Sequence, residues 1–363
     1  MVNSNANAIG IIFPNSYDNL VPELAGDRLM ASIPFAGRYR IIDFLLSSLA
    51  NCGISNIAIV VRENHHSLMD HLGSGREWDL LRKNGGLSIF PPYAEKNMKV
   101  YSGRVEALES ILPYLKSKKE KYVIMMDANI AVDFDFNAML AEHIESGADV
   151  TVAYTEQEIP AELIRAGAHG DMYYTLKLDD GRVRRIFMNS EMCGKQNLAM
   201  NIYIMDREAL IDKIHAAFVR GSSCFERDIL APRLEKYNIR GYKYDGYYAR
   251  ICGLKSYFDE NMKLLDDENL DALFTGGQIY TKIRDDNPTR YINGCKTKNN
   301  LVADGCVIEG DVENCVLFRG VKIAKGAKIR NSVLMQDTVV KAGGRLDYVV
   351  TDKNVTIEVG QEL

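Results

Sequence analysis

Residues 301–360 read LVADGCVIEGDVENCVLFRGVKIAKGAKIRNSVLMQDTVVKAGGRLDYVVTDKNVTIEVG. Single or paired aliphatic residues recur every five to seven positions, and Gly or Asn stands in the turns between them. A period of about six with small turn residues is typical of a left-handed parallel β-helix, in which three short strands form one triangular coil. Because neither an amphipathic helix nor a strand pair keeps this period over sixty residues, we predict a β-helix over residues 294–363.

The predicted β-helix has two candidate roles, acyl transfer and subunit association. Acyl transfer needs a catalytic histidine within or beside the coils, and no histidine follows His215. The flat faces and open edges of such solenoids tend to associate. The sequence therefore favours an oligomerising or regulatory domain.

The residues before the β-helix divide into an α/β domain, 1–275, and a polar linker, 276–293, with an Asn-Pro pair at 287–288. Short apolar runs at 8–13, 56–61 and 122–126 suit strands buried on both faces of a sheet. We predict further strands at 98–101, 148–155, 172–178, 182–188 and 198–205, and a strand pair within 240–251. Apolar periodicity predicts helices at 105–116, 207–220, 226–237 and 254–274, and a first helix opening with PFAGRYRIIDF at 34–44.

The loop after the first strand, PNSYDNLVPELAG at 14–26, lacks the features of a phosphate-binding loop. No glycine occurs between Gly10 and Gly26, and no Lys or Arg between Ile9 and Asp27. The loop instead offers Asp18 and Glu23, which would repel a polyphosphate. This is either not a nucleotide site or a lost one.

Composition narrows the class of protein. The 363 residues are 47% apolar and carry a net charge of −5, which gives no reason to expect nucleic-acid or membrane binding. The seven cysteines form no CxxC pair, so we interpret them as reduced thiols. There is no signal-peptide pattern and no long apolar span, and we expect a soluble, cytoplasmic protein.

Several stretches together resemble the glucose-1-phosphate adenylyltransferase (ADP-glucose pyrophosphorylase) family. They are PFAGRYRIIDFLLSSLANCGI at 34–54, YSGRVEAL at 101–108, where the family has Tyr-Arg-Gly-Thr-Ala-Asp-Ala, LAMNIYIMD at 198–206, and the hexapeptide coils. The resemblance covers essentially the whole chain. It implies a Rossmann-like, GT-A-like nucleotidyltransferase domain followed by the β-helix, and a magnesium-dependent reaction of ATP with glucose 1-phosphate that releases pyrophosphate.

The residues on which that chemistry depends in the family are changed here. The glycine loop becomes PNSYDNL, and a basic residue of the following run becomes Met30. The two metal-binding aspartates fall on Asn129 and Arg250, and the sugar-phosphate lysine falls on Asn189. Asn donates only a neutral oxygen and Arg brings a positive charge, so we expect no catalytic residues, no metal and no cofactor, with Mg²⁺ bound only if catalysis is retained.

A retained scaffold with lost chemistry resembles the GlgD-type subunits that accompany a catalytic GlgC-type subunit in some bacteria. The resemblance implies a regulatory chain in a heterotetramer with such a partner, with a homo-oligomer as the form adopted alone and a small-molecule effector as a further ligand. Two alternatives stay open: a weakly active sugar-1-phosphate nucleotidyltransferase, and a stand-alone sensor that binds sugar nucleotides.

Two groups of residues remain as candidates for ligand binding. Arg28, Arg38 and Arg40 are candidates for an anionic effector or a subunit contact, and Arg40 matches a family position associated with the effector site; the alternative is solvated charge at a helix start. The other group, Gly103, Glu106 and Asp127, either keeps contacts in a residual substrate cleft or serves structure alone, as a turn, a helix N-terminus and a buried carboxylate.

Overall fold

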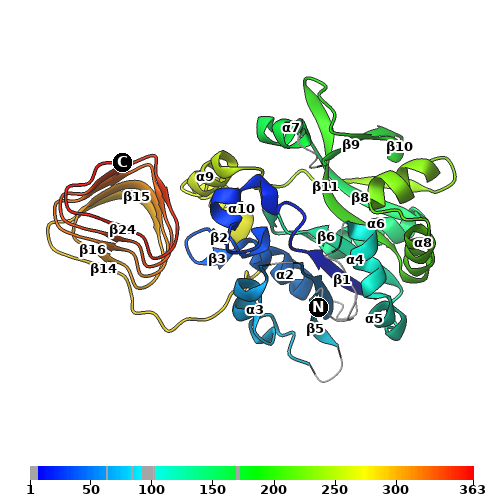
Figure 1. The fold of residues 1–363 in the computed structure, drawn as a ribbon, viewed down its shortest axis with the longest axis horizontal. Coiled ribbons are helices and arrows are strands. Elements are labelled where there is room, and N and C mark those ends of the chain that lie inside the picture. The colour runs from blue at the N-terminus through cyan, green and yellow to red at the C-terminus, as the bar shows by residue number, and fades with distance from the viewer. Residues whose placement is uncertain (1–6, 63, 83–84, 92–100, 102, 169–171) are drawn as a thin grey trace.

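The computed structural model describes residues 7–62, 64–82, 85–91, 101, 103–168 and 172–363. Figure 1 shows a large α/β domain and, on the left, a separate stack of short strands coloured orange to red. The predicted order of a mixed α/β domain followed by a β-helix is confirmed. Most of the strand predicted at 98–101 lies outside the described residues.

The centre of the α/β domain is a nine-stranded mixed sheet. Its strands β1, β4, β5 and β6 are parallel, whereas β11 is antiparallel to both of its neighbours β6 and β8. In sheet order the strands are β5 (Gly86–Phe90), β4 (Asn56–Val60), β1 (Ala8–Phe13), β6 (Tyr122–Asp127), β11 (Lys195–Asp206), β8 (Val150–Glu158), β12 (Ile239–Lys243), β10 (Arg182–Met188) and β9 (Tyr174–Asp179).

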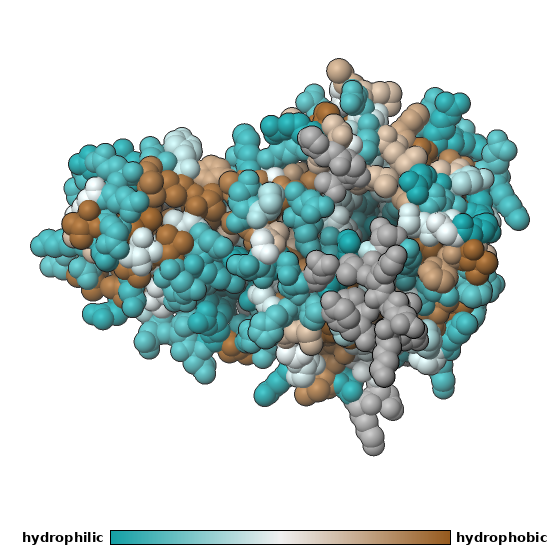
Figure 2. Space-filling model, in the orientation of Figure 1, coloured by the Kyte–Doolittle hydropathy of each residue, from teal (hydrophilic) through white to brown (hydrophobic). Residues whose placement is uncertain are grey.

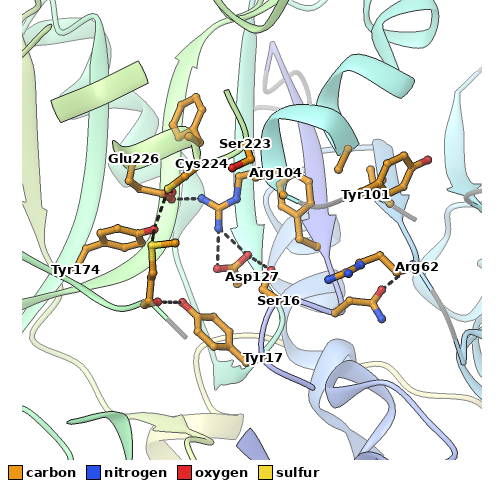
Figure 3. Close-up of a pocket in the computed structure, with 17 residues that line it drawn as sticks. Ser16, Tyr17, Arg62, Tyr101, Arg104, Asp127, Tyr174, Ser223, Cys224 and Glu226 are labelled. Carbon is orange, nitrogen blue, oxygen red and sulfur yellow. Dashed lines mark hydrogen bonds and ion pairs between the residues drawn. The ribbon is translucent and has the colours of Figure 1, made fainter. Parts of the chain in front are cut away.

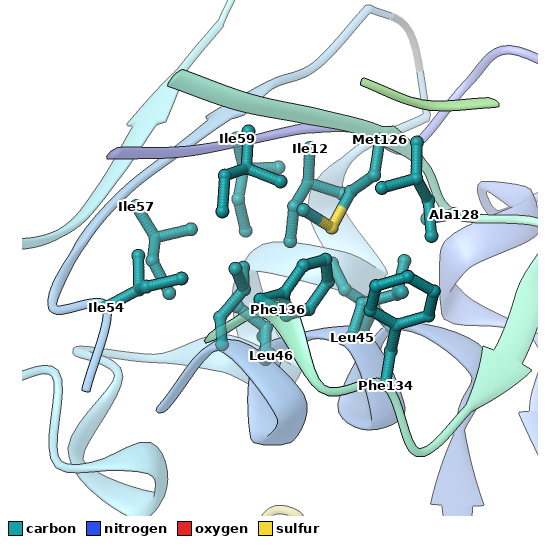
Figure 4. Packing of buried hydrophobic residues seen from close by; sticks show 14 of the residues in the cluster. Ile12, Leu45, Leu46, Ile54, Ile57, Ile59, Met126, Ala128, Phe134 and Phe136 are labelled. Carbon is teal, nitrogen blue, oxygen red and sulfur yellow. The ribbon is translucent and has the colours of Figure 1, made fainter. Parts of the chain in front are cut away.

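Helices cover both faces of this sheet. The α-helices of the described chain are α1 (Pro22–Ala25), α2 (Ile41–Asn51), α3 (His66–Leu72), α4 (Arg104–Ser110), α5 (Leu112–Ser117), α6 (Phe136–Glu145), α7 (Ala161–Ala168), α8 (Arg207–Val219), α9 (Leu254–Lys263) and α10 (Asp267–Phe274). Of these, α1, α9 and α10 pack away from the sheet, in an apolar cluster shared with the β-helix. Successive residues of β1 pack on opposite sides, Ile12 with α2 and α6, and Ile11 with α4, α5 and α8. In Figure 4, Ile12 and Met126 point from the sheet toward Leu45 of α2. Each such buried side chain contributes about 1.5–3 kcal/mol.

Residues 34–40 form a hairpin and not the start of a helix, so that prediction was wrong. Strands β2 (Pro34–Phe35) and β3 (Tyr39–Arg40) are joined by Ala36 and Gly37, whose φ angles are 53° and 77°. Two successive positive φ angles make a tight turn that suits glycine. Helix α2 then begins at Ile41, and its Asp43 carboxylate accepts the Arg40 backbone N–H at 2.9 Å.

The helices predicted at 105–116 and 254–274 are each two helices. Pro113 has no N–H to donate, which separates α4 from α5. Asp266 accepts the N–H of Glu268 at 3.0 Å and so starts α10 separately from α9. The stretch predicted as a helix at 226–237 is one π-helical turn, Glu226–Leu230, followed by a 3₁₀ turn, Ala231–Arg233.

Two short strands bring separate segments together beside the sheet. Strand β13 (Tyr248–Arg250) pairs with β7 (Ile130–Val132), and not with β12 as the predicted strand pair implied. In this register Arg250 lies opposite Ile130. The pairing places residue 250 beside the segment that follows β6.

The β-helix consists of short parallel strands that stack in three faces. Ile308, Ile323, Val340 and Ile357 lie in register and are buried inside. One corner carries asparagines with positive φ whose side-chain amides bond from coil to coil, Asn299 to Asn314 at 3.0 Å and Asn314 to Asn331 at 3.3 Å. The strands are β14 (Arg290–Tyr291), β15 (Lys296–Val302), β16 (Val307–Ile308), β17 (Asp311–Leu317), β18 (Lys322–Ile323), β19 (Lys328–Arg330), β20 (Val333–Leu334), β21 (Val339–Val340), β22 (Arg345–Asp347), β23 (Val350–Thr351) and β24 (Thr356–Ile357).

The first coil begins at Arg290 with β14, which lies within the stretch 276–293 predicted as a linker. The β-helix packs against the α/β domain through α9 and the β2–β3 hairpin. Val316 and Val333 share an apolar cluster with Tyr257, and Arg28 forms a two-fold hydrogen-bonded ion pair with Asp352 at 2.8 and 2.7 Å. Among the described residues, no helix combines the length and the apolar character required to cross a bilayer.

Candidate functional site

A cleft of about 230 Å³ lies beyond the carboxyl ends of β1 and β6, where open α/β sheets bind ligands. Its walls come from the loop after β1, the start of α4, the end of β6 and residues 223–226 (Figure 3). Ser16, Arg104, Asp127 and Glu226 supply its polar groups, and Phe13 and Tyr174 are among its aromatic ones. Polar and aromatic groups are thus interspersed around the cleft (Figure 3).

An ion network of three side chains fills the inner end of the cleft. The Arg104 guanidinium donates from Nη2 to both oxygens of Asp127, at 2.8 and 2.7 Å, and from Nη1 to Glu226. The Ser16 hydroxyl donates to Asp127 at 2.7 Å. Asp127 and Glu226 are both buried. Figure 3 shows the guanidinium between the two carboxylates.

The electrostatics of the network follow from burial and pairing. Burial raises the pKa of the Asp127 carboxyl, and the nearby Arg104 and the Ser16 hydrogen bond oppose that rise. Burial alone would lower the pKa of Arg104, but Asp127 and Glu226 raise it well above its ordinary value. The guanidinium carbon also lies 5.2 Å from the Phe13 ring centre and 5.4 Å from that of Tyr203. Arg104 is therefore permanently charged, and two carboxylates and two aromatic rings contact its guanidinium.

The loop after β1 is held by its own side chains. The Asp18 carboxylate accepts the Met30 N–H at 2.7 Å and the Asn15 amide at 2.8 Å, and burial raises its pKa to about 6. The Tyr17 hydroxyl donates to the carbonyl of Met172 at 3.0 Å. The loop thus satisfies its own backbone N–H with a carboxylate, and Asp18 is not among the residues that line the cleft.

Asn129 and Arg250, two of the altered positions, are brought together. The Ile251 N–H donates to the Asn129 carbonyl at 2.9 Å, and the Asn129 side-chain amide lies 3.5 Å from the Ile251 carbonyl. The Arg250 guanidinium donates to the Ala199 carbonyl at 2.7 Å and lies 5.6 Å from the Tyr248 ring centre. A buried amide and a buried guanidinium do not fit a divalent cation, which requires anionic oxygens.

Asn189 and Met30, the other altered positions, have roles in the fold. Asn189, with φ of 49°, accepts the Tyr173 N–H at 3.1 Å and donates to the Gly167 carbonyl at 3.1 Å. Met30 is buried in the apolar cluster that joins the two domains. In the described part of the chain, no three His, Cys, Asp or Glu side chains are placed to hold a metal ion together.

Gly103 lines the cleft, as predicted for a residual cleft contact, whereas Glu106 does not. A Cβ atom on Gly103 would lie 2.3 Å from the Ser223 carbonyl oxygen, so the backbones can approach only with glycine at this position. Glu106 lies one turn further along α4 and is half-buried. Sequence reasoning missed Arg104 and Glu226. The signal for Arg104 was its place in the YSGRVEAL run, where the family has a threonine.

A second pocket, which we call the basic pocket, lies between the α/β domain and the β-helix and encloses about 310 Å³. Two of the three predicted anion-binding residues, Arg38 and Arg40, line it; Arg28 does not, because Asp352 holds its guanidinium. The lining residues are Arg38, Arg40, Asp70, His71, Lys282, Arg284, Arg319, Gln336, Asp337, Lys353 and Asn354. The basic side chains outnumber the acidic ones.

Arg319 and Lys353 show that this positive charge is incompletely neutralised. Arg319 is 4% exposed and donates to the Lys282 carbonyl at 3.3 Å, while its Nε and Nη2 have no hydrogen-bond partner among the described residues. The Asp286 carboxylate is 3.9 Å from Nε. Burial, together with Arg40 and Arg28, lowers the pKa of Lys353 to about 8. Such a site favours an anion.

Comparisons with known proteins agree with this architecture. Residues 24–186 match the nucleotidyl transferase family, and residues 285–363 match the GlmU-like C-terminal hexapeptide family. The chain is 32% identical over 355 residues to the glycogen biosynthesis protein GlgD of Bacillus subtilis, covering 97% of this chain and 91% of that protein.

Glucose-1-phosphate adenylyltransferases are similarly related. Those of Bacillus mycoides and Bacillus cereus are each 32% identical over 336 residues, which is 91% of this chain and 87% of theirs. The similarity runs through both the nucleotidyltransferase domain and the β-helix. The chain therefore belongs to the glucose-1-phosphate adenylyltransferase family, in which it is also similar over nearly its whole length to GlgD.

Proposed function

We propose that this chain is a regulatory, catalytically impaired subunit of glucose-1-phosphate adenylyltransferase in bacterial glycogen synthesis. In this proposal it modulates the activity or effector response of a GlgC-type catalytic partner, which converts ATP and glucose 1-phosphate to ADP-glucose and pyrophosphate. The observation that carries the proposal is the adjacency of Asn129 and Arg250. These positions match the family's metal-binding aspartates, and here they present an amide and a guanidinium.

Nucleotidyl transfer depends on charge stabilisation at the reacting phosphate. Removing even one preorganised hydrogen-bond donor from an active site costs about 100- to 1,000-fold in kcat, and here the metal ligands and the sugar-phosphate lysine are all changed. Asp127, the carboxylate closest in sequence to Asn129, is paired with Arg104 and so does not replace the missing ligands. The expected turnover of the chain alone is therefore negligible.

The basic pocket supports a regulatory role. Arg40 and Arg319 are largely buried beside Lys353, and the partial neutralisation of these groups favours a multiply charged anion such as a phosphorylated metabolite. The pocket lies between the two domains. A ligand there contacts both domains at once and can stabilise one arrangement of them over another.

The β-helix supports association with a partner chain. On the face formed by β16, β18, β21 and β24, small and aliphatic side chains line a shallow groove together with the charged Glu309, Lys322 and Lys341, and Val359 there is 71% exposed. Figure 2 shows brown, apolar side chains among teal ones over the β-helix on the left. We assign this face to a GlgC-type subunit in a heterotetramer, and to a second copy of this chain when no partner is present.

An ADP-glucose synthesis assay with three arms tests the proposal: this chain alone, a GlgC-type subunit alone, and both together. We expect no turnover from this chain alone, and a changed rate or effector response when it joins the partner. Turnover by the chain alone at the rate of ordinary family members would instead favour a nucleotidyltransferase. If the partner's rate and effector response stay unchanged, the regulatory role is ruled out. Anion binding to this chain without any effect on the partner would favour a stand-alone sensor.

A further inference from the structure

Arg104, Asp127 and Glu226 come from three separate parts of the chain. Arg104 is the first residue of α4, Asp127 ends β6, and Glu226 begins the π-helical turn before β12. The guanidinium joins the two carboxylates, and the Ser16 hydroxyl of the loop after β1 completes the cluster. Arg104, Asp127 and Glu226, which we call the ion triad, connect the main walls of the cleft.

The geometry of the ion triad is that of a cation bound by acidic ligands. Both oxygens of Asp127 and one oxygen of Glu226 contact the guanidinium. The rings of Phe13 and Tyr203 also contact it, with their centres 5.2 and 5.4 Å from its carbon. Two carboxylates with a hydroxyl nearby are also the oxygen ligands that a hard divalent cation uses, completed by water. In this cleft the cation is a side chain.

The Arg104 guanidinium and a divalent cation cannot both occupy this position, because both are positively charged and both would contact the same carboxylate oxygens. A divalent cation bound to these oxygens lies within about 2–2.6 Å of them, so it would take the same position against Asp127 and Glu226 that the guanidinium nitrogens now hold. It would displace the guanidinium from its only described anionic partners and leave a permanently charged group buried without compensation. Breaking a buried ion pair in this way is strongly destabilising, because it leaves one charge buried without its partner.

We propose that Arg104 is an internal cation that takes the place of a divalent metal in this cleft, and that its removal exposes a latent divalent-cation site made by Asp127 and Glu226. This inference rests on the proposed function in one respect only, that the chain needs no metal for catalysis. It explains how two buried carboxylates are accommodated side by side in this cleft without a metal ion, since Arg104 supplies the compensating positive charge.

Binding of Mn²⁺, followed by the loss of its free-ion paramagnetic resonance signal, tests the proposal on the full chain. We expect the wild type to bind no Mn²⁺ in the cleft. Arg104→Ala is expected to bind one equivalent, at least tenfold more tightly than any residual binding to the surface of the wild type, and the double variant with Asp127→Asn is expected to lose that site again. Arg62→Ala is the matched control, because Arg62 lines the same cleft without an ion pair in the described chain.

A second variant keeps the test decisive if Arg104→Ala does not fold. Arg104→Gln removes the charge and keeps a shorter polar side chain with a hydrogen-bond donor, and it is also expected to gain the Mn²⁺ site. The proposal is overturned if wild-type protein binds Mn²⁺ through Asp127, or if folded Arg104 variants bind no more Mn²⁺ than Arg62→Ala. Neither Mn²⁺ result depends on the ADP-glucose synthesis assay. Failure of the proposed regulatory role can therefore be distinguished from failure of the proposal that Arg104 takes the place of a metal.

Discussion

Arg250 lies next to Asn129, because β13 pairs with β7 and the N–H of the residue after Arg250 donates to the Asn129 carbonyl at 2.9 Å. These two positions, far apart in sequence, are the ones that the sequence resemblance matched to the family's metal-binding aspartates. The strand pairing brings an amide and a guanidinium side by side at the place where the proposed function expects metal ligands to have been lost. Arg250 now has a structural role, since its guanidinium donates to the Ala199 carbonyl on β11 at 2.7 Å.

Replacing Arg250 with Ala is expected to destabilise the α/β domain. The change leaves the buried Ala199 carbonyl without this hydrogen bond and removes the contact between the guanidinium and the Tyr248 ring. We expect a loss of about 1–3 kcal/mol in the free energy of unfolding, measured with urea. Arg240→Ala is the control, because Arg240 also donates to a backbone carbonyl but at an exposed position. Equal losses in the two variants would contradict the structural role of Arg250.

The ion pair between Arg28 and Asp352 is expected to couple the two domains. It has two hydrogen bonds, and the Arg28 side chain is only 11% exposed. A double-mutant cycle with Arg28→Ala and Asp352→Ala should give a coupling energy of about 1 kcal/mol or more in the free energy of unfolding. The exposed pair Lys341 and Glu358 on the β-helix is the reference, and its coupling should be about 0.5 kcal/mol or less. A coupling no larger than this reference would rule out the interdomain role.

The fold was largely predictable because its signals are local. The apolar run at 8–13 forms β1 with those bounds, and the hexapeptide period at 301–360 forms the β-helix. Both patterns reflect burial of alternate or periodic side chains, which a sequence displays directly. The predictions failed where one backbone feature overrides such a pattern. Pro113 divides a continuous apolar helix pattern into α4 and α5, and positive φ angles at Ala36 and Gly37 turn residues 34–40 into a hairpin.

The candidate sites were less predictable because they depend on contacts between distant residues. Arg104 and Glu226 are 122 positions apart, and no local pattern indicates that they meet. The basic pocket was indicated by Arg38 and Arg40, but its other cations come from the linker and the β-helix. Arg28, which the sequence grouped with Arg38 and Arg40, is instead held by Asp352, a partner that only the domain packing brings within reach.

Stability is expected to fall as pH rises from about 4 to 6 because of Asp18. Burial raises its pKa from 3.8 to about 6, so the folded state holds the proton more tightly than the unfolded state. The resulting stabilisation is fully present below pH 4 and is lost as pH rises through 6. The free energy of unfolding of the wild type, minus that of Asp18→Asn, should fall by on the order of 2 kcal/mol over this range, measured by urea unfolding at each pH. A difference that stays constant with pH would contradict the assignment, and Asp79→Asn, at an exposed carboxylate, controls for loss of one charge.

Anion binding to the basic pocket is expected to weaken as pH rises through 8. Lys353 has its pKa lowered to about 8 by burial and by Arg40, Arg28 and Arg284, with Asp352 opposing the shift, so it loses its charge in this range. Sulfate is the probe because its own charge does not change there. Its affinity, measured by calorimetric titration, should fall several-fold between about pH 7 and pH 9.

The variant Lys353→Met separates this effect from a general loss of positive charge. It is expected to bind sulfate more weakly at pH 7 and to show no further weakening up to pH 9, whereas Lys298→Ala, at an exposed position of the β-helix outside both the basic pocket and the proposed association face, should behave like the wild type. The same depressed pKa has a consequence for stability. A lysine whose pKa is lowered in the folded state destabilises it while charged, so this cost is full below pH 8 and disappears as pH rises toward the ordinary value of 10.5. Sulfate affinity that is independent of pH in the wild type would show that Lys353 does not take part in the site.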